Sequence, residues 1–187
     1  MENQENHLGF YILNETQRKD GYLGAVLVTD QHGRPLEFRV THPVKPSVFQ
    51  RPLYGDALEP FIGIELCGKQ LLTHLDHSLD LLIVSEEFLL GVRDFVPCPT
   101  VHVQRAGDVI EIEADRVTGR SLFKQQITSS SGRYQPVVIG VGREHKDDVE
   151  RGRALLEKTF THVDLLEPFE RITRALELLA QENHNFA

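Results

Sequence analysis

The segment THLDHSLD combines side chains that bind metal ions or transfer protons. On a helix, His74 and His77 would lie about 60° apart around the axis and one turn apart along it, so they could share an ion. Asp76 would point away from both. Because a zinc-type site needs at least three converging ligands, the fold would have to add another, such as His42 or His102. The segment predicts a metal site at His74 and His77 only if it is completed from elsewhere.

An alternative interpretation of the same segment is the polar end of a helix. Leu71 and Leu75 each fall within about 20° of Ile64 on a helical wheel, which predicts a helix that leads up to the segment. Histidines are favourable at the end of such a helix, because the negative end of its dipole attracts positive charge. Asp80 then begins the next strand. In this interpretation the segment holds no metal.

The first third of the chain predicts an antiparallel meander. Its middle strand is continuously apolar, as in a strand buried on both faces, and its third alternates apolar and polar residues. Gly33 marks the turn between these two strands. The three predicted strands are Leu8 to Glu15, Gly21 to Asp30 and Leu36 to Val44.

The rest of the chain alternates helices with short strands. The second half ends in two helices, and the last of them carries a one-sided apolar stripe that includes Phe169 and Leu176. We therefore predict a mixed α/β (α+β) fold, with an N-terminal antiparallel meander in a central sheet, flanking helices and two C-terminal helices. We expect one domain over residues 1–187, with a possible seam near 106–108.

The order of three strands, a helix and a strand is similar to that of ribonuclease-H-like nucleases. That resemblance implies two-metal cleavage, which needs a carboxylate in the middle of the first strand. Here the first strand carries Asn14 and then Glu15 only at its exit, and Asp30 already lies in a turn. If the fold is of this type, we expect a copy without the activity.

The sequence contains no G-x-S-x-G elbow, Walker A loop or G-x-G-x-x-G motif, and it points to no particular cofactor. Phe49, Arg51 and Tyr54 lie in a predicted loop and belong to residue types that anchor protein interfaces. The stripe with Phe169 and Leu176 must cover either the chain's own sheet or a partner. These features favour a non-catalytic subunit or adaptor that acts through protein–protein binding, or self-association, in a larger bacterial complex.

Two alternatives remain open. One is a metal-dependent hydrolase or nuclease with a His/Asp site, built from His74, His77 and acids such as Asp30 or Asp76. The other is a small-molecule sensor domain, because a central sheet flanked by helices often holds a ligand pocket.

The net charge is −8, which argues against non-specific nucleic-acid binding because phosphate contacts need cations. One local exception is a possible cationic patch formed by Arg116, Arg120, Lys124 and Arg133, although such a group is more often a solvated face. No apolar run approaches the ~20 residues that span a bilayer, so we expect no membrane contact. The two cysteines suit a reducing compartment, and we expect a cytoplasmic protein.

Overall fold

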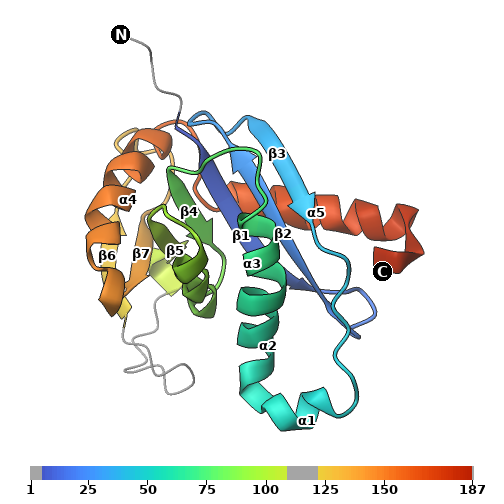
Figure 1. Ribbon diagram of the computed structural model, residues 1–187. Coiled ribbons are helices and arrows are strands. Elements are labelled where there is room, and N and C mark those ends of the chain that lie inside the picture. Colours follow the sequence, from blue (N-terminus) through green and yellow to red (C-terminus); the bar gives the residue numbers. More distant parts are fainter. Residues whose placement is uncertain (1–5, 109–121, 187) are drawn as a thin grey trace.

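The structure is a computed structural model that describes residues 6–108 and 122–186. It contains a seven-stranded sheet in the order β3-β2-β1-β4-β5-β7-β6 (Figure 1). The strands are β1 (Leu8–Glu15), β2 (Tyr22–Thr29), β3 (Pro35–Val40), β4 (Leu81–Val84), β5 (Thr100–Arg105), β6 (Leu122–Ile127) and β7 (Val137–Gly142).

The sheet is mixed. Strands β1, β2 and β3 pair antiparallel, while β1, β4 and β5 run parallel. Strand β7 is antiparallel to both β5 and β6. The predicted α+β class and its N-terminal meander are therefore confirmed. Strands from before and after residues 106–108 belong to the same sheet, and the domain division stays a prediction.

Helices cover both faces of this sheet. The run before β4 comprises α1 (Gln50–Tyr54), a 3₁₀ turn η1 (Gly55–Ala57), α2 (Leu58–Phe61), a π-helix η2 (Ile62–Gly68) and α3 (Lys69–Leu72). A 3₁₀ segment η3 (Glu87–Phe95) follows β4, and η4 (Ala106–Asp108) follows β5. Beyond β7 come η5 (Arg143–His145), α4 (Asp147–Thr159), α5 (Glu167–Glu182) and η6 (His184–Phe186).

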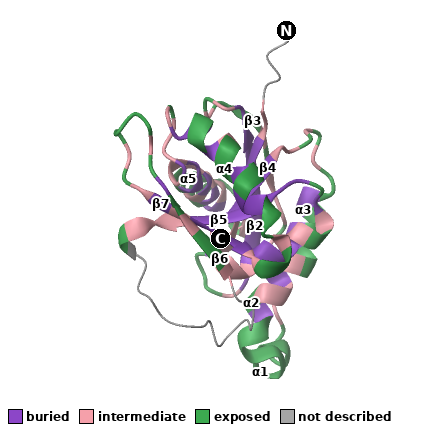
Figure 2. Cartoon of the chain, turned by 90° about the vertical axis from the view of Figure 1, so that its left-hand side faces the viewer, coloured by how far each residue is buried: buried purple, intermediate pink, exposed green. Residues whose placement is uncertain are grey.

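Two apolar clusters form the core, one on each face of the sheet. One joins β1 and β2 to α4 and α5, and the other joins the same strands to the run from α2 to α3 and to η3. Alternation along β1 divides its side chains, so that Phe10 belongs to the first cluster and Tyr11 to the second. Figure 2 shows the buried central strands and the exposed helix α1.

The π-helix depends on close backbone packing. A side chain at Gly68 would place its Cβ 2.6 Å from the Gly63 carbonyl oxygen. That oxygen accepts a hydrogen bond of 2.6 Å from the buried Tyr11 hydroxyl in the middle of β1. Tyr11 is thus fixed to the wide helical turn above it, and burial raises its pKa well above the usual range.

In the part of the chain that the structure describes, none of the helices is both long enough and apolar enough to cross a membrane.

Candidate functional site

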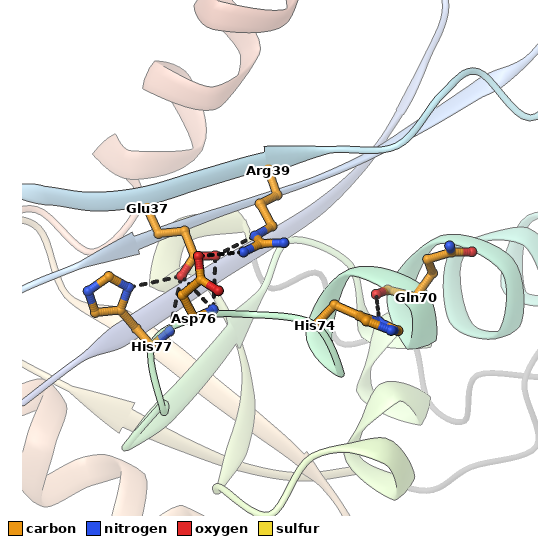
Figure 3. A network of polar contacts seen from close by, with 6 residues as sticks. All are labelled: Glu37, Arg39, Gln70, His74, Asp76 and His77. Atoms are coloured by element: carbon orange, nitrogen blue, oxygen red, sulfur yellow. Dashed lines mark hydrogen bonds and ion pairs between the residues drawn. The ribbon is translucent and has the colours of Figure 1, made fainter.

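The segment THLDHSLD is tied to the edge strand β3 (Figure 3). Glu37 accepts hydrogen bonds from the backbone N–H groups of Asp76 and His77 and, at 2.9 Å, from His77 Nδ1. Arg39 pairs with Glu37 and, at 2.8 Å, with Asp76. Burial alone would raise the pKa of Glu37, but these hydrogen bonds outweigh it and lower the pKa to about 2. His74 is not part of this network.

The two predicted metal ligands therefore make different contacts. His74 lies just beyond the end of α3, where its Nδ1 donates to the Gln70 carbonyl at 2.9 Å. Within residues 6–108 and 122–186, no group of three His, Cys, Asp or Glu side chains is arranged to hold a metal ion. His42 stacks on Phe186, and His102 lies on β5. A metal at His74 and His77 stays a prediction.

The loop also fixes the amino end of β1. The His7 backbone N–H donates to Asp80 at 2.8 Å, and the His7 and His77 rings meet edge to face with centroids 5.4 Å apart. At this end of the sheet, Glu37 and Asp80 each have hydrogen-bond donors, and the geometry is that of a structural clamp.

The opposite end of the sheet, where the parallel strands β1, β4 and β5 finish, has a different arrangement of charged side chains. In sheets with parallel strands, ligands bind outside the carboxyl ends of those strands. Glu15 ends β1, while Glu86 and Glu87 follow β4 after one residue, Ser85. Glu59 approaches from α2, where it accepts a hydrogen bond of 3.2 Å from the Tyr22 hydroxyl.

These carboxylates act on one another. The pKa of Glu86 is raised, first because surrounding protein excludes water from its carboxyl group and then because Glu59 and Glu87 repel its charge. The pKa of Tyr22 is raised by burial and by Glu59, while Arg51 opposes that rise. Negative charges therefore crowd at the end of β4, and a bound cation would relieve them.

The cationic side chain of Lys124 on β6 reaches this end of the sheet. Val84, His102, Gly140 and Lys124 follow one another across four neighbouring strands, so their side chains point to the same face of the sheet. Lys124 Nζ pairs with Glu87 at 2.6 Å. Burial lowers the pKa of His102, although Glu87 opposes the change, so the imidazole beneath this pair is neutral at pH 7.

A surface hollow of about 530 Å³ adjoins the same end of the sheet and is bounded by Tyr22, Arg51, Gly55, Asp56, Leu58 and Glu59. Arg51, one of the predicted partner-binding residues, thus lies beside the carboxylates. Phe49 is 77% exposed, and Tyr54 packs on Phe61 with ring centroids 4.9 Å apart. Partner binding by these residues stays a prediction.

Phe169 and Leu176 belong to the core between α5 and the sheet. Of the two interpretations of the terminal apolar stripe, the structure shows the one in which α5 covers the chain's own sheet.

Sequence reasoning missed Glu59, Glu86 and Glu87 as a group. They come from α2 and from the turn after β4. The parallel pairing of β1 with β4 brings these elements to one end of the sheet. The usable signal is the Ser85-Glu86-Glu87 turn, in which two acidic residues follow a buried strand. The cationic patch was a second signal: Lys124 does reach the site, whereas Arg116 and Arg120 lie outside the described residues.

Comparison with known proteins gives the fold. No family model matches the chain, and no curated protein matches it significantly. Endonuclease V of Bacillus subtilis is similar over 96% of this chain and 84% of its own, with a TM-score of 0.58 and 12% identity. Endonuclease V of Ciona intestinalis, in complex with a DNA that contains inosine, covers 84% of this chain and 78% of its own at TM-score 0.49 and 14% identity. Argonaute of Marinitoga piezophila covers 84% of this chain and 26% of its own, with a TM-score of 0.40 and 10% identity.

The first match corrects two predictions. A non-catalytic adaptor or complex subunit that works through protein binding is wrong, because the fold is one that a nuclease uses. The expectation that non-specific nucleic-acid binding is unlikely is contradicted by the same match. Its argument used the net charge of the whole chain, whereas phosphate contacts depend on local cations such as Lys124. The chain therefore shares the fold of Bacillus subtilis endonuclease V.

Proposed function

We propose that this protein is a nuclease that hydrolyses phosphodiester bonds of nucleic acid at the carboxyl ends of β1, β4 and β5. The observation that carries the proposal is that Glu59, Glu86 and Glu87 come together at the strand ends of a fold shared with a nuclease. The raised pKa of Glu86 agrees with this crowding. Carboxylates that raise one another's pKa are typical of sites that bind cations or transfer protons.

A two-metal centre fits the described residues poorly. Such a centre would need a carboxylate in the middle of β1, and that position holds Tyr11, whose hydroxyl is bonded to Gly63. A single Mg²⁺ fits better, because this ion commonly uses one or two protein carboxylates and completes its shell with water and substrate phosphate. Glu59 and Glu86 are the residues that would hold it.

The remaining residues have separable roles in this proposal. Bound Mg²⁺ would neutralise charge that develops on the phosphate. Arg51 lines the hollow beside Glu59 and offers a guanidinium to the nucleic-acid backbone. Tyr22 donates its hydroxyl hydrogen bond to Glu59 and so orients that carboxylate. We further propose a cytoplasmic location, which two free, buried cysteines support.

The test is a cleavage assay on single- and double-stranded DNA and RNA with Mg²⁺, comparing the wild type with Glu86→Gln. The variant keeps the side-chain shape but loses the charge, so we expect cleavage to fall by at least ~10-fold. Glu177→Gln, an exposed glutamate on α5, is the matched control and should cleave as the wild type does. A folded wild type that cuts none of the four substrates, or a fully active Glu86→Gln variant, would overturn the proposal.

A further inference from the structure

Lys124 reaches the proposed site across a neighbouring strand. It lies on the outer strand β6, its carboxylate partner Glu87 lies in η3, and β7 runs between β6 and β5. The residue of β7 opposite Lys124 is Gly140. A Cβ at Gly140 would lie 3.8 Å from Lys124 Cγ, so the lysine stem runs over this glycine. The glycine leaves the path to Glu87 free of a side chain.

The pair between Lys124 and Glu87 is accessible to a ligand. The two side chains are 39% and 27% exposed, whereas those of the Arg93–Asp148 pair nearby are 20% and 4% exposed. Asp148 also accepts a hydrogen bond from the Thr100 backbone, so Arg93 holds a carboxylate that is part of the core. An anion from outside can therefore replace Glu87 at Lys124 far more easily than it can replace Asp148 at Arg93.

The lysine side chain is suited to exchanging one anionic partner for another. A lysine ammonium is a compact point charge on a flexible stem, so it can turn from one oxygen to another without a fixed bonding geometry. The buried His102 lies two strands in from Lys124 on the same face, and burial lowers its pKa, so its imidazole does not compete with Lys124 for Glu87 as a second cation at pH 7. In the free protein the Glu87 carboxylate pairs with the Lys124 ammonium, in the place that a phosphate oxygen would take in a complex.

We propose that Lys124 is a phosphate-binding residue for nucleic acid, and that it exchanges Glu87 for a backbone phosphate when nucleic acid enters the site. This inference rests on the proposed function, since it assigns a contact to the same substrate. Glu87 then acts as an internal competitor: it neutralises Lys124 in the free protein and weakens binding by the energy needed to break the pair.

The proposal makes opposite predictions for the two partners. Removal of the lysine charge in Lys124→Gln removes one phosphate contact, so binding weakens and the slope of log K against log salt falls by about 0.7 for single strands and 0.9 for duplexes. Lys124→Arg keeps the charge and keeps the slope. Glu87→Gln removes the competitor and tightens binding at low salt.

The experiment is fluorescence anisotropy with labelled single-stranded and duplex oligonucleotides, with Ca²⁺ in place of Mg²⁺, over about 50 to 200 mM salt. Lys158→Gln, an exposed lysine near the end of α4, is the matched control for one lost charge. If the wild type binds and Lys124→Gln has the same slope as Lys158→Gln, this inference fails while the proposed function stands. Weaker binding by Glu87→Gln would also contradict it. A wild type that binds no oligonucleotide overturns both proposals.

Discussion

The two ends of the central sheet treat their carboxylates in opposite ways. At the amino end, Glu37 accepts hydrogen bonds from backbone and side-chain donors, and its pKa falls to about 2. At the carboxyl end, Glu86 faces Glu59 and Glu87, and its pKa rises. Carboxylates surrounded by donors stabilise a fold, whereas carboxylates that repel one another destabilise it and are typical of functional sites. The histidine-rich segment thus belongs to the structural end of the sheet.

The largest effect should come from Glu37→Gln. The substitution removes the charge that Arg39 and His77 face while it keeps most of the shape, and it leaves half-buried donors poorly paired around a largely covered side chain. We expect a loss of about 2 kcal/mol in the free energy of unfolding, measured by urea denaturation at pH 7. Glu65→Gln, at an exposed position on the π-helix, is the control and should change little. Equal stability of the two variants would mean that the clamp is absent in solution.

The unfolding free energies of the wild type and of Glu37→Gln should also depend differently on pH. Glu37 has a pKa of about 2 in the folded state and an ordinary value near 4.5 when unfolded. Its ionised form therefore stabilises the fold above about pH 4.5, and that stabilisation, about 3 kcal/mol at most, is lost as the pH falls toward 2. The difference in unfolding free energy between wild type and Glu37→Gln should shrink over that window. A difference that stays constant from pH 6 to pH 3 would contradict the assignment.

The smallest effect, with the opposite sign, is expected for Glu86→Gln. Because the folded state raises the pKa of Glu86, the ionised carboxylate destabilises the fold at neutral pH, and its removal should stabilise the protein by up to about 0.5 kcal/mol. The same variant should lose cleavage activity. Thermal unfolding at pH 7 and again below pH 4 checks the sign, because the gain should vanish where Glu86 is protonated. Destabilisation of this variant would remove the contrast between the two ends of the sheet.

The sequence was sufficient for the meander and for the α+β class, because those depend on local alternation and turn residues. It was insufficient for the site. Glu37 and His77 are separated by a helical run and meet only after β3 and the loop before β4 pack together. Glu59 and Glu86 likewise come from different elements, and nothing in their local sequence shows that the fold brings them together. Net charge also misled, since it averages over a surface on which Lys124 and Arg51 lie close to the candidate site.

The contact between Tyr11 and the π-helix bears on how this chain can change. Tyrosine and aspartate codons differ by a single base, so a carboxylate in the middle of β1 is one mutation away. The exchange would remove a fully buried ring and leave a cavity, with a charge beside the Gly63 carbonyl oxygen. The loss of packing alone would be about 3 to 5 kcal/mol. Side-chain packing, more than the number of base changes, therefore separates this sequence from one with a carboxylate in the middle of β1. Any path to such a sequence would first have to rebuild the turn around Gly63 and Gly68.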